Sequence, residues 1–131
     1  PSIIFLMTAF GLSKKEIISN KNHITTLFEV GQGHYDYPFR CVWKRDDSQH
    51  NILQVLFTVP KKKVPLAVNR NRIKRQMKEA YRLNKHLLLA SLQEKKAKAS
   101  IILIYSESHA LEFDQIQDKI SVTLQRLAQE V

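Results

Sequence analysis

Cysteine, glycine and proline are all scarce in this chain of 131 residues. With a single cysteine, the chain can form no internal disulfide and no zinc site built from several cysteines. Three glycines and four prolines exclude a collagen-like chain and a long flexible linker. No run of 18 apolar residues is present, so the sequence predicts no membrane-spanning helix and no membrane partner. The cysteine content also fits a reducing compartment, and we expect a cytoplasmic protein.

Residues that could carry out catalysis are equally sparse. The five histidines have no partner at i,i+4 and no cysteine beside them, which argues against a zinc site. Asp46 and Asp47 could bind Mg²⁺, but the following serine is more typical of a turn. Cys41 alternates with apolar residues and is expected to be inert. Since no nucleophile is paired with a base, we expect no catalytic residue and no tightly bound cofactor in the polypeptide itself.

The positive charge is concentrated in one segment. Residues 61–85 contain ten basic residues and one acid, Glu79, and therefore carry the whole net charge of +9. The rest of the chain is balanced, with eleven residues of each sign. A charge this localised indicates a polyanionic partner, nucleic acid before membrane.

The apolar pattern predicts an α+β two-layer sandwich with a three- or four-stranded sheet. We expect residues 1–7 to be an extension, with Met7 as a candidate natural start, and residues 8–131 to be a single domain. The predicted elements are helices over 22–30, 67–86 and from 113 onward, and strands over 37–43, 52–59 and 100–105.

Details of these elements can be predicted as well. A capping box over 13–16 is expected to begin a short turn, and Asp114 is expected to cap the last helix. Ile24, Leu27 and Phe28 are predicted to share one face of the first helix. In the first strand the side chains of Phe39, Cys41 and Trp43 should point into the core, and those of Arg40 and Val42 to the other face. Residues 87–99 are predicted to extend the basic helix before a Lys-Ala-Lys loop.

The basic helix should present a wide cationic face to solvent. Its core side is formed by Ile73, Met77 and Tyr81, which leaves most other positions to arginine and lysine. The planar guanidinium of arginine can hold a phosphate through two hydrogen bonds and can stack on bases. These features favour an RNA partner, while a DNA-binding helix remains open as an alternative. Major-groove readers normally carry fewer charges than this helix.

The segment over 67–82, AVNRNRIKRQMKEAYR, closely resembles the signature of the bacterial ribonuclease P protein subunit. Further resemblance is found at Phe10-x-Leu12-x-Lys14, at Leu27-Phe28-x-x-Gly31 and at the strand that ends before the three lysines of 61–63. The resemblance covers about residues 8 to 130. It implies a ribosomal protein S5 domain 2-like fold, with a left-handed β-α-β crossover that contains the basic helix.

The resemblance also implies a function. In this family an RNA subunit hydrolyses a phosphodiester bond with bound Mg²⁺ and removes the 5′ leader from precursor tRNA. The protein is the second component of that holoenzyme, docks on the RNA subunit and contacts the single-stranded leader. It needs no obligate protein partner. A general or ribosome-associated RNA-binding protein is the alternative function.

Three groups of residues correspond to family positions. The residues implied to contact the RNA subunit are Arg70, Asn71, Arg72, Lys74, Arg75, Lys78 and Arg82. Lys61, Lys62 and Lys63 would flank this RNA and the substrate. Phe28, Arg40 and Val42 would line the leader cleft, although Phe28 could instead be a core residue.

This chain departs from the family pattern at three places. Pro65-Leu66 stands where many members have Gly-Asn, and Ile24 where many have phenylalanine. Ser106 and Glu107 follow the last strand, where many members have basic residues. The contacts to the leader are therefore less firmly implied than the docking helix.

Overall fold

The computed structural model describes residues 14–131, and the expectations for residues 1–7, Phe10, Leu12 and Ser13 lie outside that part of the chain. The elements follow the predicted order, with one further strand after the first helix. They are η1 (Lys14–Glu16), α2 (Lys21–Val30), β1 (Gln32–Asp36), β2 (Phe39–Arg45), β3 (Leu53–Thr58), α3 (Ala67–Lys95), β4 (Ala99–Tyr105) and α4 (Phe113–Glu130).

The four strands form one mixed sheet in the order β1-β2-β4-β3. β2 pairs antiparallel with both β1 and β4, whereas β3 runs parallel to β4. β4 lies inside the sheet, and six of its seven residues are buried, as its unbroken apolar run predicts. Because β3 and β4 are parallel neighbours, α3 has to carry the chain from one end of the sheet back to the other.

β1 is the strand that the sequence did not predict. Its residues, QGHYD, include a glycine and show no apolar alternation, so periodicity alone gives no strand here. The pairing with β2 defines it, with Gln32 opposite Trp43 and Asp36 opposite Phe39. β2 begins at Phe39 rather than at the predicted Tyr37, because Tyr37 and Pro38 form the turn of this hairpin.

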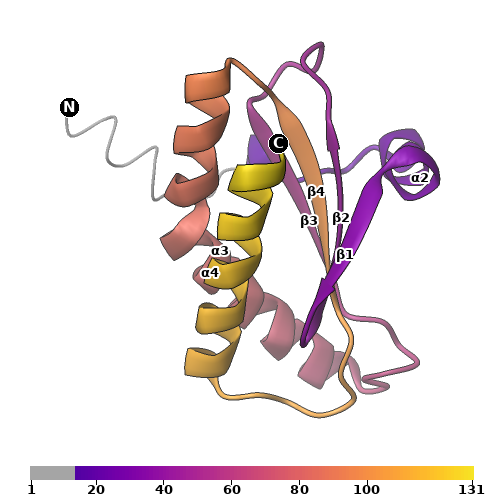
Figure 1. Cartoon of the computed structure of the whole chain (residues 1–131). Helices are drawn as coiled ribbons and strands as arrows, with labels where there is room; N and C mark the ends of the chain where they lie inside the picture. Colours follow the sequence, from indigo (N-terminus) through magenta and orange to yellow (C-terminus); the bar gives the residue numbers. More distant parts are fainter. Residues whose placement is uncertain (1–13) are drawn as a thin grey trace.

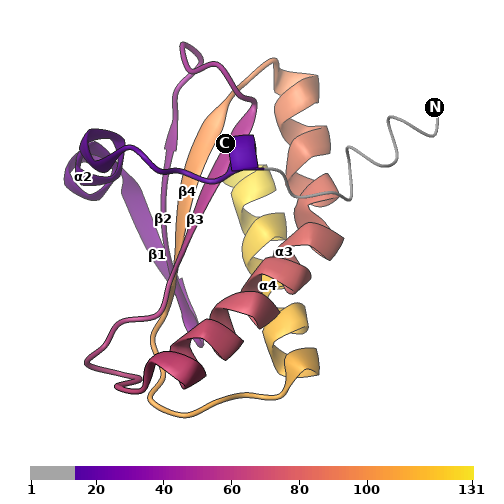
Figure 2. The same ribbon diagram turned by 180° about the vertical axis from the view of Figure 1, so that it is seen from behind.

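Helices lie on both faces of the sheet, α3 and α4 on one side and α2 on the other (Figures 1 and 2). The larger core fills the space between the sheet and the α3–α4 pair, and Phe39, Cys41 and Trp43 belong to it as predicted. A smaller cluster beneath α2 contains Leu27 and Val42. The sheet and the α3–α4 pair thus form the two predicted layers of an α+β fold, and α2 covers part of the remaining sheet face.

α3 is a single helix of 29 residues and includes the extension predicted beyond residue 86. The predicted core positions of this helix are all buried: Ile73, Met77, Ala80, Tyr81 and Leu88. The helix ends where Lys96 adopts a left-handed conformation, with φ of 54°, and its N–H bonds to the carbonyl of Gln93. The long helix therefore serves both as a wall of the core and as the support of the basic segment.

An ion pair ties α3 to the segment that precedes α2. Lys85 is fully buried, and its Nζ lies 2.6 Å from Oε1 of Glu16 in η1. Ile17 then forms a parallel bridge with Val55 at the edge of β3, and the N–H of Ile18 donates to the carbonyl of Val55. Lys85, one of the cations of the basic segment, is therefore engaged inside the protein, where it holds η1 against α3.

The sequence assigned the wrong N-cap to α4. Asp114 was predicted to cap the helix, but Glu112 occupies that position and its N–H donates to Oε1 of Gln115 at 3.1 Å. Asp114 lies in the first turn instead, where a carboxylate interacts favourably with the helix dipole. Asp114 is the residue that N-cap preferences favour, whereas Glu112 is selected by its reciprocal hydrogen bonds with Gln115, which residue preference alone does not reveal.

Only part of the predicted apolar face of α2 contacts the sheet. Leu27 is buried and Ile24 packs against it at the margin, whereas Phe28 is 52% exposed, so these three side chains do not share one buried face. Asn20 caps the helix by accepting from the N–H groups of the next turn. At the other end a Cβ on Gly31 would overlap the carbonyl oxygen of Leu27, which makes glycine a steric requirement there.

A polar cluster joins β1 to the last turns of α4. Nε2 of His34 lies 3.1 Å from Oδ2 of Asp36 without the alignment of a hydrogen bond, and Nδ1 lies 3.7 Å from Oε2 of Glu130. Arg126 contacts both carboxylates. Burial, and then the charge of Arg126, lower the pKa of His34 against the opposing effect of the two carboxylates. Folding therefore disfavours protonation of this imidazole.

Candidate nucleic-acid interface

The solvent-exposed side of α3 carries a row of cations. Arg72, Arg75 and Lys78 are exposed, and no carboxylate within residues 14–131 pairs with them. With Lys74 included, they span an arc of about 160° around the helix at 100° per residue. The opposite side of the helix is fixed in the core by Ile73 and its neighbours. The predicted cationic face is thus present, and the packing of the helix in the core keeps this face exposed to solvent.

Two other predicted contact residues are already engaged within the protein. Nη1 of Arg70 donates to the carbonyls of Val64 and Pro65, at 3.0 and 2.6 Å, and so fixes the loop that leads into α3. Arg82 bonds to both oxygens of Glu79, at 3.1 and 2.6 Å. This pairing lowers the pKa of Glu79 and raises that of Arg82. We therefore rank these two arginines below Arg72 and Arg75 as phosphate ligands.

The remaining predicted residues of the basic segment lie near the start of α3. Asn71 is exposed and Lys74 is half-buried. Lys61, Lys62 and Lys63 are all exposed in a turn in which the N–H groups of Lys63 and Val64 bond to the carbonyl of Pro60. Because this turn directly precedes α3, the three lysines extend the positive surface beyond the N-terminus of the helix.

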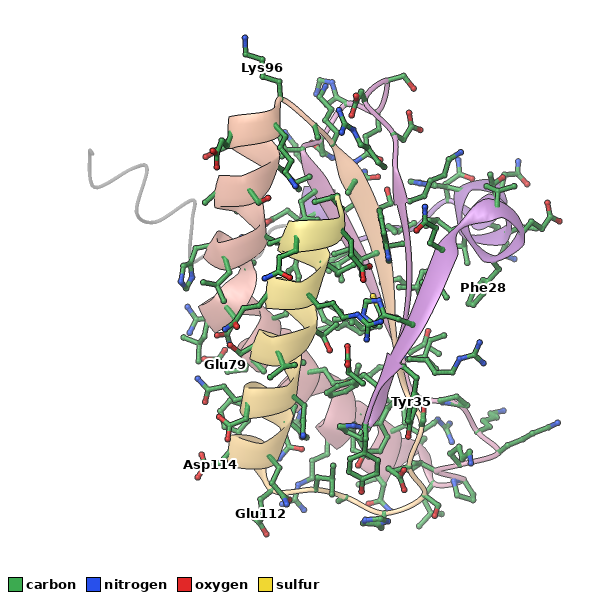
Figure 3. All side chains as sticks on the ribbon, viewed as in Figure 1. Phe28, Tyr35, Glu79, Lys96, Glu112 and Asp114 are labelled. Atoms are coloured by element: carbon green, nitrogen blue, oxygen red, sulfur yellow. The ribbon has the colours of Figure 1, made fainter. Side chains whose placement is uncertain are left out.

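The residues predicted to bind the leader lie on the opposite face of the sheet. Phe28 projects from α2 and Arg40 from β2, and both are exposed. Val42 is only 7% exposed and packs in the cluster beneath α2, so it supports this surface from below. Figure 3 shows Phe28 on α2 and Tyr35 on the strand next to it in the sequence. The structure thus leaves an aromatic ring and a guanidinium available on this side.

Tyr35 is a surface residue that the sequence analysis missed. It lies opposite Arg40 in the β1–β2 pairing, Arg40 lies opposite Ile104, and Ile104 lies opposite Thr58. Directly paired residues point to the same face of a sheet, so these four side chains form one row across it. Tyr35 is 53% exposed. The sequence pattern could not place Tyr35 on a face of the sheet, because β1 was not predicted.

The residues that the sequence set aside as structural occupy structural places. Trp43 and Cys41 are buried, and burial raises the pKa of the Cys41 thiol, which keeps it protonated. Asp46 accepts hydrogen bonds from Ser48, and Asp47 pairs with Arg45 at 3.0 Å, as in a polar turn. Within residues 14–131 no group of three or more histidine, cysteine or acidic side chains is arranged to hold a metal ion.

The structure also shows where the residues that depart from the family pattern lie and what they contact. Leu66 takes the N-cap position of α3 without a side-chain hydrogen bond and is 65% exposed. Ile24 packs at the margin of the cluster beneath α2 and presents no aromatic ring there. After β4, the N–H of Ser106 bonds to the carbonyl of Pro38, and the carboxylate of Glu107 lies 3.9 Å from Nδ1 of His109.

No helix in the described part of the chain is long and apolar enough to cross a bilayer.

Comparison with known proteins decides the family. The model of the family described as Ribonuclease P matches residues 12–128. The chain belongs to the ribonuclease P protein family. The ribonuclease P protein component of Porphyromonas gingivalis strain W83 is 39% identical over 121 residues, which cover 91% of this chain and 88% of the relative. That of Chlorobaculum tepidum is 65% identical over 85 residues, 62% of this chain and 55% of the relative.

Solved structures of the ribonuclease P family share the fold. The RNase P protein of Staphylococcus aureus superposes with a TM-score of 0.70 at 19% identity, covering 86% of this chain and 94% of that one. The RNase P protein of Thermotoga maritima gives 0.68 at 18% identity, with 85% and 96% covered. The α+β arrangement seen in residues 14–131, a four-stranded mixed sheet with three α-helices, is thus that of ribonuclease P proteins. The RNA subunit follows as the partner that membership in this family implies.

Proposed function

We propose that this protein assists an RNA catalyst in removing the 5′ leader from precursor tRNA, by docking on the RNA subunit through α3 and on the leader through the α2 face of the sheet. The observation that carries this proposal is the row of exposed cations on a core-anchored helix whose sequence resembles the family signature. Phosphate neutralisation by these side chains would supply most of the affinity for the RNA subunit.

The leader is assigned to the other face because of the groups exposed there. Phe28 and Tyr35 offer two aromatic rings on which bases can stack, and Arg40 offers a charge for a phosphate or a further stacking plane. Stacking tolerates any base sequence, which suits leaders that differ from one tRNA to the next. Val42 and Ile104 would support the rings from the sheet.

Catalysis is assigned to the RNA subunit and its bound Mg²⁺. The protein itself would act through RNA docking and leader binding. We also infer that the parallel β3-α3-β4 unit is the left-handed crossover of the S5 domain 2-like fold, and that no further protein is required. Since the proposed substrate is precursor tRNA, we propose that the protein acts in the cytoplasm.

Cleavage of a precursor tRNA by a bacterial ribonuclease P RNA, with and without this protein, tests the function. At low, near-physiological Mg²⁺ we expect strong stimulation, with the cut at the mature 5′ end. Tight binding of the RNA subunit without stimulation would favour a general RNA-binding role. Equal affinity for duplex DNA of the same length would count against docking on a structured RNA.

Substitution of Phe28 tests the assignment of the leader. We expect Phe28→Ala to weaken binding of precursor tRNA to the holoenzyme by about 5- to 150-fold, the range for loss of one stacked base, and to change binding of mature tRNA little. Val30→Ala is the matched control, because Val30 is an equally exposed apolar residue of the same helix. Equal losses for both tRNAs would show that Phe28 does not contact the leader.

A further inference from the structure

A surface hollow lies between α3 and the first turn of α4. It has a volume of about 370 Å³ and is shallow and open to solvent. Its lining residues are Arg72, Arg75, Gln76, Glu79 and Phe113. The four α3 residues follow the spacing i, i+3, i+4, i+7, so they form one stripe along the helix. The hollow therefore adjoins the cationic face but adds an aromatic ring and a carboxylate to it.

The side chains around the hollow can recognise a flat heterocycle. Phe113 is half-buried against the main core, so its ring is held in place with part of its surface exposed. Guanidinium groups such as those of Arg72 and Arg75 stack on bases and donate to their acceptor edges. Oε1 of Gln76 is buried without a hydrogen-bond partner among the described residues. A donor brought in by a ligand would satisfy it, directly or after rotation of the amide.

The carboxylate of Glu79 distinguishes a base from a phosphate. The hydrogen bonds from Arg82 hold this carboxyl ionised and keep its pKa below the usual range. An ionised carboxylate repels a phosphate, but it accepts hydrogen bonds from the N–H groups of a base. Figure 3 shows Glu79 on α3, with Glu112 and Asp114 at the start of α4, so the region around the hollow is less cationic than the rest of the interface.

We propose that this hollow receives one unstacked base of the RNA subunit. Guanine matches the groups present best, because its N1–H and N2 amine would donate to Glu79 while its O6 and N7 would accept from an arginine. Phe113 would provide the stacking plane. This inference rests on the proposed docking of α3 on the RNA subunit. It adds a base-recognition site to a surface that otherwise binds RNA phosphates through its positive charge.

Substitution of Phe113 tests the stacking role. We expect Phe113→Leu, which keeps an apolar side chain against the core, to lower the affinity of the full chain for the ribonuclease P RNA by about 5- to 150-fold. The salt dependence of that affinity should stay unchanged because no charge is lost. Val122→Ala is the control, since Val122 is an exposed apolar residue of α4 outside the hollow.

Substitution of Glu79 is expected to change the affinity for RNA in opposite directions under two explanations, binding through charge alone and binding of a base. If α3 bound RNA through charge alone, Glu79→Gln would strengthen binding, because it removes a negative charge from the interface. The base site predicts weaker binding, because glutamine replaces one of the two acceptor oxygens with an NH₂ donor, which cannot accept from the N–H groups of the base. Glu79 is exposed, so this variant should fold even if Phe113→Leu does not.

The identity of the base can be read from the RNA. Kethoxal modifies N1 and N2 of unpaired guanines, and we expect one such guanine of the RNA subunit to be protected by the wild-type protein and exposed again with either variant. Unchanged affinity and an unchanged modification pattern in both variants would overturn the base site while leaving the docking intact. Failure of the wild-type protein to bind the RNA subunit would overturn the proposed function together with it.

Discussion

Simultaneous replacement of Arg72 and Arg75 by alanine separates RNA docking from folding. Both side chains are exposed and have no carboxylate partner among the described residues, so we expect the free energy of unfolding to change by less than about 0.5 kcal/mol. The effect on RNA binding should be large. A hydrogen bond from a charged group contributes about 1.5 kcal/mol or more, so the two arginines together contribute about 3 kcal/mol, or roughly 150-fold in affinity.

The salt dependence gives a second, independent magnitude. Each phosphate contact contributes about 0.7 to 0.9 to the slope of log K against log salt concentration. The double variant should therefore flatten the slope by about 1.4 to 1.8 if both arginines contact phosphates, and by about 0.7 to 0.9 if one of them donates to the proposed base. The assay is filter binding of the ribonuclease P RNA between 50 and 200 mM salt, with urea unfolding of the same samples. Arg70→Ala is the contrasting variant, because loss of its bonds to Val64 and Pro65 should lower stability as well as affinity.

One result would refute this reasoning. If the double variant kept the wild-type slope but lost more than about 1 kcal/mol of stability, the two arginines would be structural and the exposed face of α3 would be assigned wrongly. An unchanged slope with unchanged stability would place the RNA on another surface of the protein.

Three further predictions concern the scaffold. Gly31→Ala should lower the free energy of unfolding by about 1–3 kcal/mol through the overlap described above, whereas Gly33→Ala, with its nearest contact at 3.5 Å, should be close to neutral in urea unfolding. Glu16→Ala should cost about 3 kcal/mol, and more than Lys85→Met, because only the first leaves a buried ammonium without its carboxylate. Because the pKa of His34 is lowered from 6.5, the unfolded chain takes up a proton before the folded one does, so stability should fall as the pH drops through 6.5; His34→Asn should remove that part of the pH dependence.

The sequence predicted the elements whose periodicity is strong. β3, β4, α3 and α4 each contain an apolar run or stripe, and the core positions predicted for α3 are buried. β1 could not be found in this way. It is an edge strand of mostly polar residues, and it is held in place by the hairpin with β2 and by contacts of His34 and Asp36 with α4. Both are long-range features that no local pattern contains.

The interface was predicted at the level of residue types but not of individual roles. The spacing of Arg72, Arg75 and Lys78 on one helix was enough to predict exposure. It did not reveal that Arg70 would turn back to its own loop, nor that Lys85 would be buried. Both cations are engaged with groups outside the helical repeat, a loop carbonyl in one case and a carboxylate 69 residues away in the other. Helical periodicity carries no information about such partners.

Positive charge on α3 is tolerated because the same helix belongs to the main core. Like charges one turn apart on a helix are unfavourable by about 0.2–0.5 kcal/mol per pair. Full burial of one side chain such as Ile73 or Met77 contributes about 1.5–3 kcal/mol and offsets several such pairs. The repulsion is nevertheless present in the free protein, and neutralisation by RNA phosphates would remove it. The free energy of docking would therefore include relief of this repulsion, and the bound helix would be more stable than the free one.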